Sequence, residues 1–341
     1  MGESLDRNRG FASGVILFIL VSSLFSLPTV AKTAEVYPSR GIEFIVDSKA
    51  GGGNDMLARG AAPFITKYLR EVSPGAKGGE IRIKNLAGGQ GLQAHTAIYN
   101  AKPDGYTIGN INSGSIYDYV TGVTKAPFDP FKFTPLFSAL RTTRVIVSGK
   151  KGATTWEELV QLSKKRPLKW AIGTLGQIMH LESIVVKEKM GLDVRLAAAG
   201  GSPQVISALL RGDADVAYLS YESCMSVVEG KEVNLLATAT DKRIFPETPT
   251  LLEKGLPQDS AIALCAIRCY YGPPHMDPEA VRLLIAAWRK VMEDPGYLSF
   301  LKTAGVIELS PLYGSEIHSW LKSYIDFYVK FDPVIRRNLK K

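Results

Sequence analysis

The chain has 341 residues, with 41 Lys and Arg against 33 Asp and Glu, and a formal net charge of +8. Its 45% hydrophobic and 22% charged residues are the proportions of an ordinary globular protein, and the absence of repeats and heptads in the sequence excludes solenoids and coiled coils. The basic residues are scattered rather than gathered in a stripe, which argues against a nucleic-acid partner and for an anionic small solute. A basic surface without a specific partner is the alternative.

The N-terminal segment has the pattern of a secretory signal peptide. Arg7 and Arg9 precede an almost unbroken apolar run over residues 11–27, and small residues around Ala31 offer a cleavage site. An uncleaved membrane anchor is the alternative, although the run is short for a bilayer span. We expect a signal peptide at 1–31, a periplasmic location and about 310 mature residues, enough for two domains.

The stretch from Ile42 to Asp55, IEFIVDSKAGGGND, predicts a buried strand that leads through a glycine turn into a helix. Gly51, Gly52 and Gly53 have no side chains, so backbone N–H groups at the turn can approach a ligand closely. The helix N-terminus adds partial positive charge, which suits a carboxylate or a phosphate. The alternative is that the glycines only make a tight turn.

The order of strand, small-residue turn and helix recurs twice in the next 60 residues. Strands are predicted at 81–84 and 106–112, and each is followed by a helix start. If the strands are parallel neighbours, their carboxyl ends converge where ligands bind in open α/β sheets. The small or amide-bearing residues at these two turns are Gly88, Gly89, Gln90, Asn112, Ser113 and Ser115.

A second α/β unit is predicted between residues 144 and 240. Four strands, at 168–172, 194–198, 216–219 and 235–240, alternate with helices, and a fourth small-residue turn spans residues 173–180. The chain then continues with an extended stretch over 262–271. Two helices, at 278–292 and 315–329, carry apolar and aromatic stripes of the kind that pack into a core.

The three cysteines do not form a disulfide framework. Cys265 and Cys269 fall in a predicted strand, where four residues span about 13 Å, too far for a bridge. Cys224 is free to pair with either of them, and the sequence does not decide this. Because there is no CxxC pair and the four His residues have unrelated spacings, no metal site is expected.

Five motifs in a fixed order resemble the substrate receptors of tripartite tricarboxylate transporters, also called the Bug family. They are YPSRGIEFIVDSKAGGGND, KNLAGGQGLQAHTAIYNAKPDGYTIG, FDPFKFTPL, LRGDADVAYLSYES and TDKRIFPETPTLLEKGLP. The resemblance extends from Tyr37 to about Leu321. It implies an α/β fold, a two-lobed periplasmic binding protein of type II (Venus flytrap) with a mixed sheet in each lobe.

The resemblance also implies domain limits, a function and partners. Lobe 1 would hold residues 32–144 and, with a hinge strand, 262–341, and lobe 2 would hold residues 145–261. A monomer would close around one small carboxylate, such as a di- or tricarboxylate, an acidic amino acid or an aromatic acid. It would deliver this solute to the large and small integral-membrane subunits of a permease. No cofactor, catalytic residue or nucleic-acid partner is implied.

In the family, one ligand carboxylate rests on the loop matching residues 50–55, and the turn matching residues 173–180 closes over the other end. Tyr218 and Ser220 match family positions near the cleft. Together with the turns described above, these matches give the following candidate binding residues: Gly51, Gly52, Gly53, Asn54, Asp55, Gly88, Gly89, Gln90, Asn112, Ser113, Ser115, Gly173, Thr174, Gln177, His180, Tyr218 and Ser220.

Asp55, His180 and Arg268 each have more than one possible role. Asp55 is acidic in a proposed anion site, where it would cap the helix, orient waters or face a ligand amine. His180 would either bond a ligand carboxylate or be structural. Arg268 replaces part of a commonly aromatic pair and would either offer a charge to the ligand or face solvent. The turn GTLGQIMH is more apolar than is usual in the family, which favours aromatic or longer-chain acids.

Two other classes of function are alternatives to a transport receptor. An orphan sensory binding protein would have the same fold and would lack only the permease. A dinucleotide-dependent enzyme is disfavoured because AGGGND does not match G-x-G-x-x-G, and a Ser hydrolase is disfavoured because no G-x-S-x-G occurs. The sequence therefore predicts a binding protein and not an enzyme.

Overall fold

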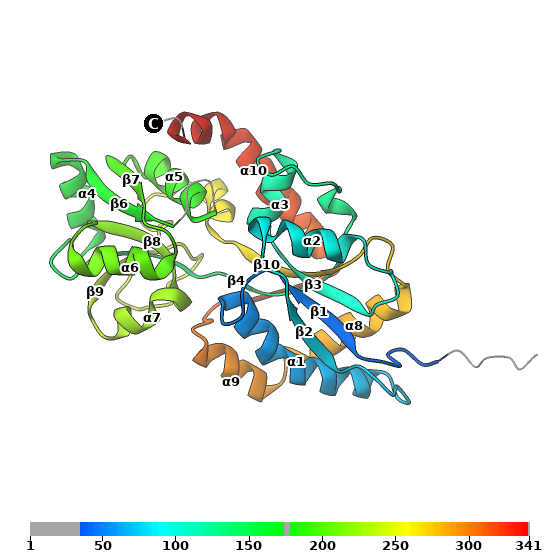
Figure 1. Ribbon diagram of the computed structural model, residues 1–341. Coiled ribbons are helices and arrows are strands. Elements are labelled where there is room, and N and C mark those ends of the chain that lie inside the picture. Colours follow the sequence, from blue (N-terminus) through cyan, green and yellow to red (C-terminus); the bar gives the residue numbers. More distant parts are fainter. Residues whose placement is uncertain (1–34, 174–177, 340–341) are drawn as a thin grey trace, which may run out of the picture. The chain divides into compact units, whose positions relative to one another are not determined.

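The computed structural model describes residues 35–173 and 178–339. These residues build two mixed β-sheets with helices on their faces (Figure 1), which confirms the predicted two-lobed α/β fold. The predicted signal peptide and the turn residues Thr174 and Gln177 lie outside the described residues. Within the described ranges, none of the helices has the length and apolar character needed to cross a membrane.

The first sheet, which we assign to lobe 1, has the strand order β11-β4-β10-β3-β1-β2. Strand β1 pairs in parallel with β2 and β3, whereas β10 runs antiparallel to β3 and β4. The carboxyl ends of β1, β2 and β3 therefore meet at one edge, as the sequence predicts. The strands are β1 (Ile42–Val46), β2 (Ile81–Asn85), β3 (Thr107–Asn112), β4 (Thr134–Arg141), β10 (Ile267–Gly272) and β11 (Leu309–Tyr313).

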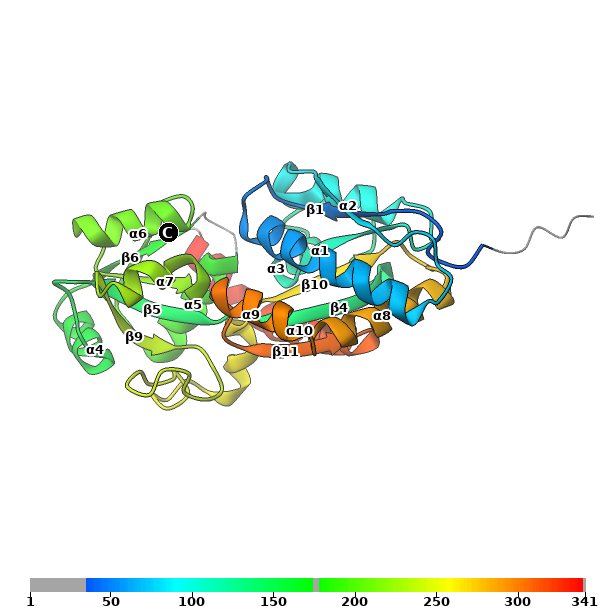
Figure 2. The same cartoon turned by 90° about the horizontal axis from the view of Figure 1, so that it is seen from below.

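Two separate cores cover the two faces of this sheet. Along β1, Phe44 and Val46 belong to one core and Ile45 belongs to the other, as the two-residue period of a strand requires. Helices α1 (Gly53–Val72), α8 (Pro278–Val291) and α9 (Pro295–Thr303) pack on the first face (Figure 2). Helices α2 (Leu92–Tyr99), α3 (Ser113–Val120) and α10 (Ser315–Leu339) pack on the second.

The second sheet, assigned to lobe 2, has the order β7-β6-β8-β5-β9 and is also mixed. Its strands are β5 (Arg144–Gly149), β6 (Leu168–Ile172), β7 (Val194–Ala198), β8 (Val216–Ser220) and β9 (Val233–Thr238). Its helices are α4 (Trp156–Lys165), α5 (Ile178–Met190), α6 (Ser202–Arg211) and α7 (Tyr221–Glu229). The sheet memberships follow the predicted alternation, and the exact domain limits stay a prediction.

The prediction of an extended stretch over residues 262–271 is wrong for the first part of that range. Residues Gln258–Leu264 form a 3-10 helix, η3, and β10 begins only at Ile267. The carbonyl oxygens of Ala263 and Leu264 accept hydrogen bonds from the hydroxyl groups of Tyr328 and Tyr218, at 2.8 and 3.1 Å. These tyrosines satisfy carbonyls that a strand would have paired with a neighbouring strand.

The three cysteines are free and buried. The pairing of Cys224 that the sequence left open is therefore not made, and Cys265 precedes β10 instead of lying in it. Burial raises the pKa of each thiol to about 12, so the thiols are protonated and unreactive at neutral pH.

Candidate ligand-binding site

A pocket lies at the edge of the first sheet where β1 and β3 end. Its volume is about 440 Å³, and we call it the strand-edge pocket. All of its lining residues except Ile178 come from the part of the chain that precedes β4. They are Asp47, Ser48, Asn54, Gly88, Gln90, Gly91, Asn112, Gly114, Ser115, Asp118 and Ile178.

Three helices begin at this pocket. Asn54 is the second residue of α1, Gly91 is the N-cap of α2 and Asn112 is the N-cap of α3. The first N–H groups of a helix have no acceptor within the helix, and the helix dipole adds partial positive charge at that end. The pocket is therefore suited to an anion, although no Lys or Arg is among its lining residues in the described part of the chain.

The turn before α1 is closed by Asp55. Its buried carboxylate accepts hydrogen bonds from the Gly51 N–H at 2.8 Å, from Asn85 Nδ2 at 2.8 Å and from Arg59 Nε at 3.0 Å. Burial raises the pKa of Asp55, but these hydrogen bonds outweigh burial and the net pKa is lowered. Asp55 thus stabilises the turn and does not line the pocket.

The N–H groups of the first two glycines already have acceptors. Gly51 donates to Asp55, and Gly52 donates to the carbonyl oxygen of Lys49 at 3.1 Å. The amides of Gly53 and Asn54, in the first turn of α1, have no acceptor four residues back in the helix. Of the predicted GGGND loop, only Asn54 lines the pocket.

The second turn holds a strained backbone next to the pocket. It forms a short 3-10 helix, η1 (Gly89–Gly91), in which Gln90 has φ +56° and Gly91 has φ +95°. Left-handed φ values are unfavourable for residues other than glycine and concentrate at functional sites. A Cβ atom at Gly91 would lie 2.8 Å from His95 Cε1, so this position requires glycine.

Asp47, which sequence reasoning missed, is the first residue after β1 and lines the pocket. Its carboxylate accepts a hydrogen bond from Asn54 Nδ2 at 2.9 Å and contacts His95 Nε2 at 3.3 Å. His95 is fully buried, and its Nδ1 is hydrogen-bonded to the Tyr119 hydroxyl. Burial alone would raise the pKa of Asp47. The contact with His95 and the neighbouring side-chain amides outweigh burial, so the net pKa is lowered and Asp47 is ionised at neutral pH.

The third turn contributes both a cap and an acid. Asn112 Oδ1 accepts the Ser115 N–H at 3.0 Å, which caps α3. Ser113 is fully buried, and its Oγ accepts the Ile267 N–H at 3.3 Å, away from the pocket. Asp118 lines the pocket, yet its carboxylate makes no hydrogen bond or ion pair with a described residue. Burial raises the pKa of Asp118 to about 7.

Lobe 2 contributes Ile178 to the pocket. A Cβ atom at Gly114 would lie 3.1 Å from Ile178 Cβ, so the two lobes approach closely there. Tyr218 is fully buried and bonds to Leu264, and Ser220 Oγ is 2.7 Å from Ser223 Oγ. His180 is also buried, and burial lowers its pKa. None of these three predicted residues lines the pocket.

The predicted site residues fall into three groups. The structure brings together Asn54, Gly88, Gln90, Asn112 and Ser115. It places outside the pocket Gly51, Gly52, Gly53, Asp55, Gly89, Ser113, Gly173, His180, Tyr218 and Ser220. Thr174 and Gln177 lie outside the described residues. Gly91, in the second glycine turn, and Ile178, in the apolar turn of residues 173–180, also line the pocket, as the sequence indicates. The pocket residues that sequence reasoning missed are Asp47, Ser48, Gly114 and Asp118.

Arg268 neither faces open solvent nor lines the pocket. Its Nη2 is 2.6 Å from Glu222 Oε1, so the ion pair joins β10 of lobe 1 to α7 of lobe 2. A Cβ atom on Gly53 would lie 3.8 Å from the same Nη2, which places the pair beside the start of α1. The charge of Arg268 is therefore matched within the protein.

Residues 73–317 match the sequence profile described as the tripartite tricarboxylate transporter family receptor, TctC. This range covers well over half of the chain. The chain belongs to this family. The predicted family resemblance is thus confirmed, and the protein is a solute-binding receptor by family.

Related proteins agree with this assignment. The receptor is 27% identical over 290 residues to a UPF0065 protein of Bordetella pertussis, covering 82% of this chain and 84% of that protein. A TctC solute-binding protein from Polaromonas has a similar fold, with a TM-score of 0.73, 22% identity and coverage of 89% of this chain and 100% of that one. Rpa4515 of R. palustris, whose structure was solved with adipate, has a TM-score of 0.70, 22% identity and coverage of 88% and 98%.

Proposed function

We propose that this receptor binds one small carboxylate in the strand-edge pocket and delivers it to a membrane permease with one large and one small subunit. The observation that carries the proposal is the convergence of three helix N-termini on a pocket that has no basic side chain among its described lining residues. Oriented N–H groups and helix dipoles bind carboxylates without a cationic side chain.

Neutral donors suit a receptor that must also release its ligand. A buried bidentate arginine holds a carboxylate strongly, whereas backbone and amide donors give weaker single hydrogen bonds. In this receptor the nearby Arg268 is paired with Glu222, and Arg59 is paired with Asp55. Both arginines therefore form ion pairs with acids of the protein. The proposed donors to the ligand are the backbone and side-chain amides.

The residues proposed to contact the ligand are those that both the sequence and the pocket select. Asn54, Gln90, Asn112 and Ser115 offer polar groups, and Gly88 lets the backbone approach closely. Ser48 Oγ lines the same pocket and is a buried hydroxyl without a hydrogen-bond partner in the described structure, which suits a contact to the ligand. The volume of about 440 Å³ lies in the range of ligand pockets, roughly 300–1,000 Å³.

Adipate in Rpa4515 supports an acid of similar size as the first solute to test, because the two proteins share a fold. The signal-peptide pattern at 1–31 supports an exported receptor, for which the periplasm is the proposed location. Close approach of Gly114 and Ile178 supports a ligand held between the lobes when they close.

The proposal is tested on the mature chain, which starts at Lys32, by thermal-shift screening of a carboxylate panel followed by calorimetry. The panel holds straight-chain mono- and dicarboxylates, tricarboxylates, amino carboxylates and aromatic acids. A true ligand stabilises the folded state by about 3–4 kcal/mol when its concentration is several hundred times its dissociation constant. If no acid shifts the melting temperature at millimolar concentration, the proposed function is wrong.

Delivery to a permease needs its own measurement. Cells that contain this receptor together with the candidate permease should accumulate the labelled acid, and cells that lack either protein should not. Uptake that does not depend on the receptor would contradict the transport role and would favour a sensory one.

A further inference from the structure

The charges in the strand-edge pocket have the wrong sign for a simple anion site. In the described structure, the lining side chains that carry charge are Asp47 and Asp118, and both are acidic. The carboxylate of Asp47 accepts a hydrogen bond from Asn54 and contacts His95 Nε2. The carboxylate of Asp118 has no such partner among the described residues.

A structural role does not account for Asp118. Its position in the last turn of α3 (Ser113–Val120) puts a negative charge near the negative end of the helix dipole, which is unfavourable. It caps no helix, because Asn112 caps the start of α3, and Thr121 follows the helix end. An acid that is partly buried, unpaired and opposed by the helix dipole lowers stability, so a ligand role is the simpler explanation for its place.

The helix N-termini and Asp118 favour opposite charges, so they would bind different ends of a ligand. The helix N-termini favour a carboxylate, and Asp118 repels a second one but attracts a cation. A dicarboxylate would place a charge next to Asp118 with no basic lining side chain to offset it. A molecule with one carboxylate and one cationic group satisfies both sets at once.

We infer that the ligand of this receptor carries a protonated amine or a quaternary ammonium in addition to its carboxylate, and that Asp118 is the residue that selects it. This inference rests on the proposed function, because it places the cationic end of the ligand in the same pocket that is proposed to bind its carboxylate. It predicts that affinity depends on the charge at the second end of the ligand, at constant chain length.

The test uses matched acids of four, five and six carbons on the mature receptor. Each set contains the monocarboxylate, the dicarboxylate and the ω-amino carboxylate, for example hexanoate, adipate and 6-aminohexanoate. Calorimetry is run at about pH 8.5, where an amine of this kind is protonated and free carboxyl groups are ionised. In at least one set, the amino carboxylate should bind about tenfold or more tightly than the dicarboxylate.

The matched variant is Asp118→Asn, which keeps the shape of the side chain and removes its charge. It should weaken the binding of the amino carboxylate by about tenfold or more, and it should tighten the binding of every acid without an amine. The carboxylate has no partner in the described structure to lose, so the variant should fold, and the smaller Asp118→Ser should change affinity in the same directions. Asp326→Asn, at an exposed position on α10, is the control and should change neither.

Each outcome has a distinct meaning. If dicarboxylates bind more tightly in all three sets, or if Asp118→Asn leaves the order of affinities unchanged, the selective role of Asp118 is wrong while the carboxylate receptor stands. If neither these nine acids nor the wider panel binds the wild-type receptor, the proposed function itself fails.

Discussion

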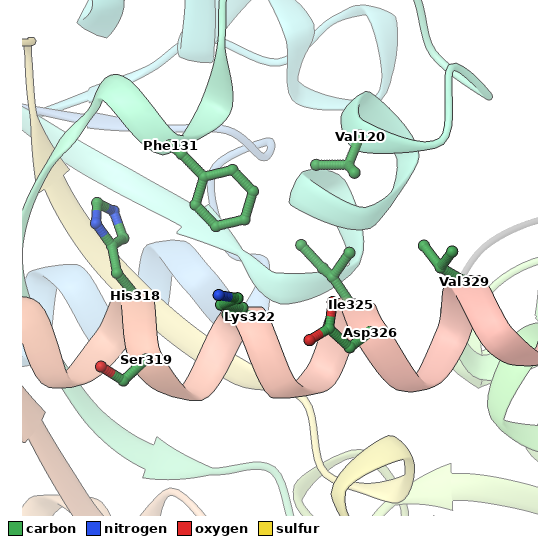
Figure 3. A pocket seen from close by; sticks show the side chains of 8 residues that line it. All are labelled: Val120, Phe131, His318, Ser319, Lys322, Ile325, Asp326 and Val329. Atoms are coloured by element: carbon green, nitrogen blue, oxygen red, sulfur yellow. The ribbon is translucent and has the colours of Figure 1, made fainter.

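The strand-edge pocket and a groove along α10 have similar volumes, about 440 and 580 Å³, but they differ in what surrounds them. The α10 groove is lined by Val120, Phe131, His318, Ser319, Lys322, Ile325, Asp326 and Val329. Six of these residues belong to α10. Figure 3 shows Val120 and Phe131 across the groove from α10. The strand-edge pocket is lined instead by turns and by helix starts.

The difference comes from which part of each helix faces the hollow. The α10 groove lies along a helix, where most backbone N–H and C=O groups are paired within the helix, so a ligand would meet mainly side chains. The strand-edge pocket lies against the starts of α1, α2 and α3, where the first N–H groups have no acceptor within their own helix and the helix dipole is positive. Helix starts, and not the size of the hollow, therefore mark the proposed ligand site.

The two hollows share one short helix. Asp118 of α3 lines the strand-edge pocket, and Val120, two residues further on, lines the α10 groove and is 40% exposed. Residues two apart lie on nearly opposite sides of a helix, so substitutions on α3 can alter one hollow without altering the other.

The largest effect is expected from Gly91→Ala. A Cβ atom at this position would lie 2.8 Å from His95 Cε1 and 3.4 Å from Asp47 Cβ, so His95 and the pocket wall must move. The φ of +95° adds about 1–2 kcal/mol of backbone strain. Ligand affinity, measured by calorimetry, should fall by about 100-fold or more.

Gly212→Ala is a control that has the backbone strain of a positive φ without crowding of the added Cβ atom. Gly212 ends α6 with φ +79°, and no atom lies within 4 Å of the Cβ position. This variant should lose a similar free energy of unfolding, about 1–2 kcal/mol, with unchanged affinity. Equal losses of affinity in both variants would mean that Gly91 acts through stability and not through the pocket.

A smaller effect is expected from Asp47→Asn. The change replaces an acceptor of the Asn54 and His95 contacts, so the free energy of unfolding at neutral pH should fall by about 1–3 kcal/mol. Because the folded-state pKa of Asp47 is lowered, its contribution to stability is present above the ordinary pKa of 3.8 and is lost as the pH falls through the folded-state pKa. Urea unfolding at several pH values should show wild type and variant converging in acid. A constant difference at all pH values would contradict the ionised role.

Much of the fold could be predicted from sequence because local signals agree with the final structure. The apolar run of β1, the glycine turn and the start of α1 occur in the predicted order, and β3 ends at Asn112 as predicted. Sequence reasoning missed β11, which contains Pro311, because proline argues against a strand except at an edge. It also missed β4, whose pairing with β10 and β11 comes from distant segments.

The site could be predicted only in part. Small residues at strand ends pointed to the edge of the sheet where the pocket lies, but which side chain faces the pocket depends on packing. Ser113 and Ser115 illustrate this, since one is buried against β10 and the other lines the pocket. Asp47 and Asp118 were missed because the search was for donors to an anion, and an acid is not a donor when ionised.

A modest effect of Asp118 is expected on the pH dependence of the free energy of unfolding. Burial raises the folded-state pKa of Asp118 from its ordinary value of 3.8 to about 7, so the unfolded chain releases this proton at lower pH than the folded chain. The free energy of unfolding should therefore decrease as the pH rises from about 4 to about 7, and Asp118→Asn should lack this decrease.

The comparison with Asp118→Asn is needed because other groups titrate nearby. Burial raises the pKa of Glu182 to about 7 against the lowering effect of Arg144, 2.9 Å away, and this acid titrates in both proteins. Asp47 lines the same pocket and is present in both proteins, and Tyr119, whose pKa burial and the charges of Asp47 and Asp118 raise, stays protonated in this pH range. Parallel stability curves for wild type and variant between pH 4 and 8 would contradict the raised pKa.

The smallest effect is expected from substitutions in the α10 groove. Val120→Ser lies on the same helix as Asp118, and Val329→Ser lies on α10, where the side chain is 49% exposed. Both positions are partly in solvent, so little buried apolar area is lost and the fold should be retained. Affinity for the acid bound by wild type should stay within about twofold, because neither side chain lines the strand-edge pocket. A tenfold loss in either folded variant would show that the ligand reaches the α10 groove, and helix starts would then no longer mark the whole binding site.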